Sequence, residues 1–164
     1  MNKLVLVVAL LFITHVHAQN SVSPDDLRIL IGDWTGSLTY VDYSSGQPFT
    51  MPANVKVEQG KNENQFILFY AYPNEPKANN KEKVTISNKG SKINGNDLIS
   101  SKSLNKDETQ FTTESPGKDN NKKALIRNIY VVGEERFIIR KEVKFEGSEE
   151  WLKRNEFSFK RKQQ

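Results

Sequence analysis

The chain changes its pattern at GDWTGSLTY, residues 32–40. In this segment large apolar side chains alternate with hydroxyl side chains, namely Trp34, Leu38 and Tyr40 with Thr35, Ser37 and Thr39. An apolar period of two residues is the pattern of a β-strand that is buried on one face. Because the same period recurs through the rest of the chain, the segment marks the beginning of an all-β domain.

A short helix is expected immediately before this strand. Ser23 is a suitable N-cap, and Pro24 suits the first helical position. Asp25 and Asp26 stand in the first turn, where the helix dipole favours negative charge. Gly32 is a typical stop signal. Helix capping therefore explains the two acidic residues without a catalytic or metal-binding role.

Alternating segments continue towards the C-terminus, separated by short turns. The expected strands cover residues 34–40, 49–57, 65–72, 124–132, 136–145 and 151–161, with shorter and more polar strands around Val84, Ile86, Ile93, Leu98, Leu104 and Phe111. Residues 73–82 are expected to form the longest loop, and the charged residues 116–123 a second one. About 8 to 10 short strands with short connections predict an all-β fold, an antiparallel up-and-down barrel with one short N-terminal helix.

The first 18 residues have the three parts of a secretory signal peptide. Lys3 gives a basic start, residues 4–13 are continuously apolar, and residues 14–18 end in Val-His-Ala. An apolar helix of that length spans about 15 Å, half of the roughly 30 Å of a bilayer core. We therefore expect cleavage after Ala18, a barrel domain over residues 19–164, and a soluble, not membrane-spanning protein in the periplasm or outside the cell.

The composition of the predicted mature chain excludes the chemistry that depends on histidine or cysteine. Both histidines, His15 and His17, lie within the signal peptide, and the sequence has no cysteine. Nucleophile pairs that use histidine, zinc sites built on histidine or cysteine, histidine-bound haem and disulfides are thereby excluded, so no cofactor, metal site or catalytic residue is predicted. Loss of Lys3 changes the formal charge from +4 to +3. This weak basic bias lacks the concentrated stripe of a nucleic-acid-binding protein, and no nucleic-acid partner is expected.

The segment LIGDWTG, residues 30–36, joins the helix end to the first strand. It resembles the opening of lipocalins and of the wider calycin family of β-barrels, and the whole chain is similar to secreted lipocalin-like proteins of Bacteroidetes-type bacteria. The resemblance implies that Gly32 and Trp34 are structural, and that an arginine of the last strand stacks on the tryptophan that closes one end of the barrel. Arg161 shares the parity of the apolar residues in its strand and is the expected arginine, with Arg154 as the alternative.

The last two expected strands can be aligned across a turn at Gly147. If this turn pairs Phe145 with Trp151, the apolar residues of both strands fall on one inner face. The same alignment places Lys141 opposite Asn155 on that face. A lysine inside the barrel is therefore expected.

The preceding turn, at Gly133, supplies the second half of the predicted site. If it pairs Val131 with Phe137, Arg127 lies opposite Lys141 on the inner face. Two opposed cations repel each other, and their burial is unfavourable unless an acid or a bound anion lies between them. The alternative is that a one-residue change in the turn sends Arg127 to the outside.

The predicted function is small-molecule binding inside the barrel. Aromatic walls with a few polar anchors are typical of such pockets. The expected ligand-binding residues are Tyr40, Tyr70, Arg127, Lys141 and Asn155. The expected partner is a small apolar or amphiphilic ligand, with an anionic group as one option. Two alternatives stay open: a barrel with a filled core that binds a protein through aromatics such as Tyr43 or Tyr72, and a calycin-like enzyme that uses a carboxylate or Lys141 as base.

Overall fold

The computed structural model describes residues 20–163, so the predicted signal peptide lies outside the described residues. The elements are α1 (Pro24–Arg28), β1 (Gly32–Val41), β2 (Pro48–Gln59), β3 (Gln65–Ala71), the 3-10 helix η1 (Pro76–Ala78), β4 (Asn80–Thr85), β5 (Lys92–Ile93), β6 (Asn96–Ser103), β7 (Glu108–Asp119), β8 (Lys122–Gly133), β9 (Arg136–Phe145) and β10 (Leu152–Arg161).

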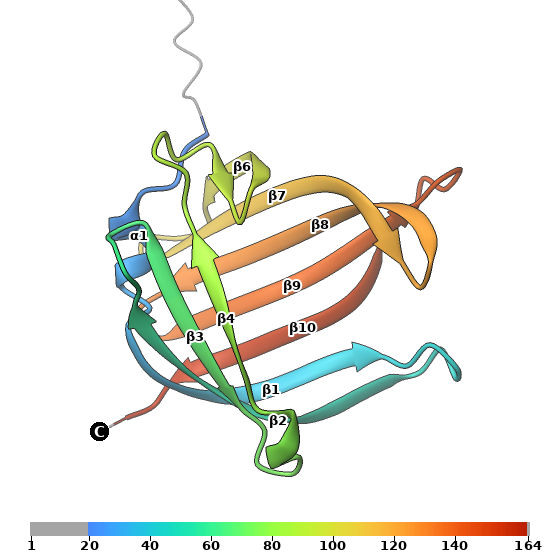
Figure 1. Ribbon diagram of the computed structural model, residues 1–164, viewed down its shortest axis with the longest axis horizontal. Helices are drawn as coiled ribbons and strands as arrows, with labels where there is room; N and C mark the ends of the chain where they lie inside the picture. Colours follow the sequence, from blue (N-terminus) through green and yellow to red (C-terminus); the bar gives the residue numbers. More distant parts are fainter. Residues whose placement is uncertain (1–19, 164) are drawn as a thin grey trace, which may run out of the picture.

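All ten strands form one antiparallel sheet in the order β4-β3-β2-β1-β10-β9-β8-β7-β6-β5. The sheet curls into a nearly closed barrel (Figure 1). A bridge between Ile86 and Ile93 joins its two margins, and the side chain of Asn94 accepts a hydrogen bond from the backbone of Thr85 at the same seam. The predicted all-β antiparallel barrel with one short N-terminal helix is confirmed.

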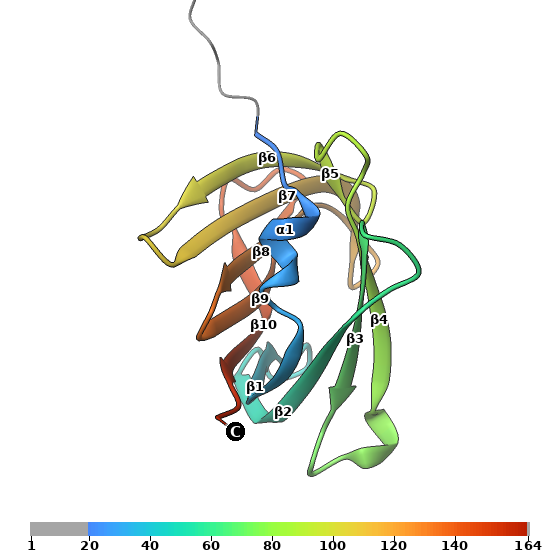
Figure 2. The same cartoon turned by 90° about the vertical axis from the view of Figure 1, so that its left-hand side faces the viewer.

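The helix α1 lies across one end of the barrel (Figure 2). Ser23 and Asp26 form a capping box, as the N-cap prediction requires. The α-helix ends at Arg28, three residues before Ile31, the last helical residue that a stop at Gly32 predicts. The backbone N–H groups of Leu30 and Ile31 instead donate to the residue three positions earlier, as in a 3-10 turn. The Trp34 indole nitrogen then donates to the Leu30 carbonyl at 2.8 Å and ties the helix to β1.

The prediction of a loop over residues 116–123 is wrong. β7 runs to Asp119 and β8 begins at Lys122, so the connection has two residues. Asn120 and Asn121 have φ angles of 46° and 61°. A two-residue hairpin turn of type I′ needs positive φ at both positions, which asparagine tolerates better than most residues. The polar composition that resembled a loop therefore belongs to two strand ends and a tight turn.

The barrel has two unlike ends. We name the end covered by α1 the core end, and the end where the turns after β1, β7 and β9 lie together the hairpin end (Figure 1). At the core end, Phe137 packs against Trp34 and against Phe159 with ring centroids 5.8 Å apart in both pairs. Tyr70 reaches across from β3 to Phe157, with centroids 4.8 Å apart. Aromatic side chains from four strands thus fill this end of the interior.

Candidate functional site

Two neighbouring rows of inward-facing residues cross the sheet in register from β7 to β1. The apolar row consists of Phe111, Tyr130, Ile139, Phe157 and Leu38. The polar row lies two residues nearer the hairpin end on every strand and consists of Thr113, Asn128, Lys141, Asn155 and Tyr40. The interior therefore changes from apolar to polar within one step along the strands.

Most side chains of the polar row are only half-buried. Tyr40, Asn128, Lys141 and Asn155 face inward, yet solvent reaches all four. At the core end, in contrast, the side chains of Trp34, Tyr70, Phe137 and Phe159 are almost completely buried. Within residues 20–163, the amide side chains of Asn128 and Asn155 make no hydrogen bond to another residue. Thr113 is fully buried and its Oγ1 has no hydrogen-bond partner among these residues. Donors and acceptors are therefore free on this row.

On the hairpin side of the polar row, Lys141 belongs to a compact group of three charged side chains and a tyrosine that we name the mouth cluster: Tyr43, Asp119, Lys141 and Arg154. Lys141 Nζ lies 2.8 Å from Asp119 Oδ1, and the Tyr43 hydroxyl donates to the same oxygen at 2.8 Å. The Arg154 guanidinium stacks on the Tyr43 ring, 3.9 Å from its centroid. The cluster joins the tips of three hairpins that are far apart in the sequence.

A β-bulge turns Arg154 towards this cluster. Lys153 pairs with Glu142 and Asn155 with Lys141, so Arg154 is the extra residue on β10. A bulge re-aims the side chains of its strand. Only 12% of the Arg154 side chain is exposed, and its Nε lies 3.1 Å from Asp119 Oδ2, within ion-pair distance. The alignment is not that of a hydrogen bond, and both Nε and Nη2 of Arg154 lack a hydrogen-bond partner among the described residues.

The charges of the mouth cluster do not cancel. The Asp119 side chain is 2% exposed and faces two cations, Lys141 and Arg154. Burial raises the pKa of Asp119, but the hydrogen bonds from Lys141 and Tyr43 and the charges of Lys141 and Arg154 outweigh it, so the pKa lies below its ordinary value. With the carboxylate ionised, the three charged groups carry one net positive charge. A buried excess of positive charge favours a bound anion.

The structure brings together three of the five predicted ligand-binding residues. Tyr40, Lys141 and Asn155 share the polar row, and the predicted pairing of Lys141 with Asn155 is present. Tyr70 also faces inward, but it belongs to the buried aromatic packing of the core end. Because of the bulge, the pairing of Phe145 with Trp151, on which the prediction was based, is absent from the register.

Arg127 lies outside the barrel, so its predicted position opposite Lys141 is wrong. Only two residues, 134 and 135, separate β8 from β9, and the register pairs Val132 with Phe137. This is one residue away from the predicted pairing, and a shift of one residue exchanges the two faces of a strand. Asn128 takes the place opposite Lys141.

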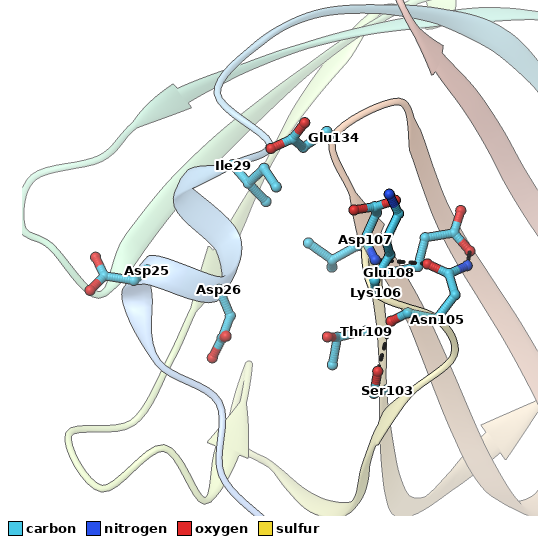
Figure 3. A pocket seen from close by; sticks show the side chains of 11 residues that line it. Asp25, Asp26, Ile29, Ser103, Asn105, Lys106, Asp107, Glu108, Thr109 and Glu134 are labelled. Carbon is cyan, nitrogen blue, oxygen red and sulfur yellow. Dashed lines mark hydrogen bonds and ion pairs between the residues drawn. The ribbon is translucent and has the colours of Figure 1, made fainter.

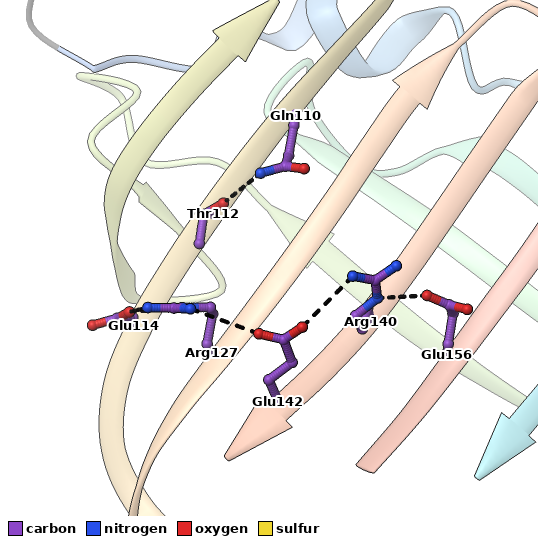
Figure 4. A network of polar contacts seen from close by, with 7 residues as sticks. All are labelled: Gln110, Thr112, Glu114, Arg127, Arg140, Glu142 and Glu156. Atoms are coloured by element: carbon purple, nitrogen blue, oxygen red, sulfur yellow. Dashed lines mark hydrogen bonds and ion pairs between the residues drawn. The ribbon is translucent and has the colours of Figure 1, made fainter. Parts of the chain in front are cut away.

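The outer face of β7 to β10 holds Arg127 in a ladder of alternating charges, Glu114, Arg127, Glu142, Arg140 and Glu156 (Figure 4). Arg127 Nη2 lies 2.6 Å from Glu114, its Nη1 lies 3.7 Å from Glu142, and its guanidinium stacks on Trp151 at 3.7 Å. The Arg127 guanidinium is thus already in contact with two carboxylates and an indole. The structure does not support the ligand-binding role predicted for Arg127.

The structural motif at the core end has the geometry that the sequence suggested. The Arg161 guanidinium lies 4.2 Å from the Trp34 ring centroid. Arg161 also donates to the carbonyl oxygens of Ile29, Ile31 and Glu134. Arg154, the alternative partner, lies in the mouth cluster instead. Gly32 has a φ of 127°, and a Cβ there would come within 3.3 Å of Arg161, so a side chain would be strained at this position.

A concavity lies at the core end between α1 and the turn from β6 to β7 (Figure 3). Its volume is about 290 Å³, and its acidic lining includes Asp25, Asp26, Asp107, Glu108 and Glu134. Among the residues the structure describes, no three His, Cys, Asp or Glu side chains are arranged to hold a metal ion. The polar row and the mouth cluster are therefore the stronger candidate site.

Sequence reasoning missed five residues of the site: Tyr43, Thr113, Asp119, Asn128 and Arg154. The Asn120-Asn121 dipeptide was the available signal, because a two-residue turn there fixes the pairing of β7 with β8. The inward turn of Arg154 depends on a bulge for which the sequence has no marker.

Fold and site together define an antiparallel β-barrel with a filled core end and a polar, solvent-reached hairpin end. The crystal structure of Rv2717c from M. tuberculosis is similar, with a TM-score of 0.56 and 10% sequence identity over 88% of this chain and 100% of that chain. At this identity the likeness concerns the fold alone. No protein-family model matches the chain, and no curated protein does. Within residues 20–163, no helix has the length and apolar character needed to cross a bilayer.

Proposed function

We propose that this protein is a calycin-type binding barrel that holds a small, partly apolar ligand with an anionic group across its polar row. The observation that carries the proposal is the contrast inside one barrel. Aromatic residues fill the core end, whereas the inward-facing Tyr40, Asn128, Lys141 and Asn155 are reached by solvent beside a buried, incompletely paired Arg154.

The two rows would bind different parts of the ligand. The apolar row, from Phe111 to Leu38, would take the apolar part of the ligand, since burial of apolar surface contributes about 25 cal/mol per Å². Lys141 and Arg154 would attract the anionic group, and the free amides of Asn128 and Asn155 would donate or accept hydrogen bonds on either side. Apolar walls with a few polar anchors are the usual composition of a small-molecule site.

Export is part of the same proposal. The signal peptide predicted over residues 1–18 would place the barrel in the periplasm or outside the cell, where it would meet its ligand. Binding in this proposal involves no covalent step, because Lys141 and Asp119 are engaged with each other as an ion pair and neither is a free base.

Native mass spectrometry of the protein purified from its source tests the proposal. We expect a co-purifying small molecule that is lost on organic extraction, and a thermal shift when the extracted protein is mixed with anionic amphiphiles. Lys141→Met should weaken both signals. Lys160→Met is the matched control, because Lys160 is an exposed lysine on β10 outside the barrel. A bare mass with no thermal shift would instead favour a filled-core barrel that binds a protein.

A further inference from the structure

We infer that the ligand of the polar row carries a single negative charge, and that Asp119 sets this preference by neutralising one of the two inward-facing cations. The inference deepens the proposed function and rests on it. It follows from the partners, burial and charges of the mouth cluster.

Asp119 acts as a fixed internal anion. Its Oδ1 accepts from Lys141 Nζ and from the Tyr43 hydroxyl, both at 2.8 Å, and its side chain is almost completely buried. Tyr43 stands on the turn after β1, which is itself well ordered by Asp42. The Asp42 carboxylate accepts hydrogen bonds from the side chains and backbone of Ser44 and Ser45, which lower its pKa to about 2. Asp119 is therefore fixed by two contacts, one from Lys141 on β9 and one from Tyr43 on the turn after β1.

Arg154 is the cation that Asp119 leaves incompletely satisfied. Its Nε faces Asp119 Oδ2 without hydrogen-bond alignment, and its buried Nη2 has no partner among the described residues. A buried donor without an acceptor is unfavourable. The anionic group of a ligand can supply that acceptor, and guanidinium groups bind planar carboxylates particularly well.

The net charge of the mouth cluster determines which ligand charge it can neutralise. Lys141, Arg154 and Asp119 together carry one positive charge, so one added negative charge neutralises the cluster. A dianion would leave an excess negative charge next to the buried Asp119 carboxylate, where the low dielectric strengthens repulsion. The inner face is thus suited to a monoanion such as a carboxylate and unsuited to a dianion such as a phosphate monoester.

The experiment compares three probes with the same twelve-carbon chain, dodecanoate, dodecyl phosphate and dodecanol, by calorimetric titration at pH 8 and low salt. The second phosphate pKa is about 6, so the phosphate is a dianion under these conditions. The full chain is tested as wild type, Asp119→Asn and Arg154→Met. Lys160→Met is the control for removal of a cation outside the barrel.

The wild type should bind dodecanoate about tenfold more tightly than dodecyl phosphate. Asp119→Asn raises the net charge of the cluster to two and should reverse this order, with about tenfold tighter binding of the phosphate. Arg154→Met should abolish the advantage of dodecanoate over dodecanol. This variant keeps the inference testable if Asp119→Asn does not fold, and Lys160→Met should behave as the wild type.

Two kinds of failure can be told apart. If the probes bind but their order is the same in the wild type and in the two cluster variants, Asp119 does not set the charge preference and the inference is overturned. If none of the three probes binds the wild type, the proposed function itself has failed.

Discussion

Strands β7 to β10 carry charged residues on both faces, and the two faces arrange them differently. On the outer face, Arg127 lies between two carboxylates, and so does Arg140. On the inner face, one carboxylate, Asp119, faces two cations. Each outer arginine has a carboxylate on both sides, whereas the inner group leaves a positive excess around two side chains that are more deeply buried than the ladder, Asp119 and Arg154. The number of partners and the degree of burial separate a structural charge from one that can bind a ligand.

The largest expected effect concerns stability. Asp119→Ala would leave the buried Arg154 and the half-buried Lys141 without their shared carboxylate. Removing one partner of a buried ion pair lowers the free energy of unfolding by about 3–5 kcal/mol. Glu114→Ala on the outer ladder should cost about 1 kcal/mol or less, because Arg127 keeps Glu142 and solvent. Urea unfolding of both variants measures the difference, and equal losses would contradict the distinction between the faces.

The next prediction compares the two ends of the barrel through one arginine at each end, Arg161 and Arg154. Arg161→Met removes the stack on Trp34 and three hydrogen bonds to carbonyl groups, and should lower the free energy of unfolding by about 2 kcal/mol. Arg154→Met removes the stack on Tyr43 and the ion pair with Asp119. Asp119 keeps its hydrogen bonds from Lys141 and Tyr43, and Nε and Nη2 of Arg154 already lack hydrogen-bond partners among the described residues, so the loss should be smaller, about 1 kcal/mol. Thermal unfolding compares them, and a larger loss for Arg154→Met would mean that its role is structural.

A smaller effect is expected at Tyr43. Tyr43→Phe keeps the ring on which Arg154 stacks and removes only the hydrogen bond to Asp119. The loss should be about 1 kcal/mol. Hydrogen exchange should become faster in the turn after β1 and stay unchanged in α1, at the other end. Unchanged exchange in the turn would show that Tyr43 does not hold it to the mouth cluster.

The smallest effect is on the acid limb of the stability profile. The pKa of Asp119 is lowered in the folded protein, so its contribution to stability is fully present above the ordinary aspartate pKa of about 3.9 and is lost as the pH falls below it. Asp119→Asn should therefore show a shallower loss of stability at acid pH than the wild type. Parallel profiles would mean that Asp119 is not held ionised by Lys141 and Arg154.

Local chemistry predicted the beginning and the fold class of this domain well. The N-cap at Ser23, the change to period two at Gly32 and the parity of Arg161 depend on neighbouring residues alone, and the sequence displays them directly. The pairing of Lys141 with Asn155 was also predicted, although from a pairing of Phe145 with Trp151 that does not form; the bulge at Arg154 restores the predicted register from Asn155 onwards.

The remainder of the site depends on turn length, which the pattern does not determine. The two-residue turn between β8 and β9 exchanged the faces of Arg127 and Asn128, and the bulge on β10 turned Arg154 inward. Asp119 was read as part of a loop because its neighbours are polar, although the turn that follows it has only two residues. A single-residue uncertainty in a hairpin is enough to hide a site in a β-barrel.

Backbone and side-chain amide NMR spectra recorded during titration with dodecanoate locate the binding site within the barrel. We expect the largest chemical-shift changes at Asn128, Lys141 and Asn155, including the side-chain NH₂ groups of the two asparagines. Residues of the outer ladder such as Arg127 should change little. Saturable changes confined to the outer face, or no saturable changes at all, would contradict a binding site inside the barrel.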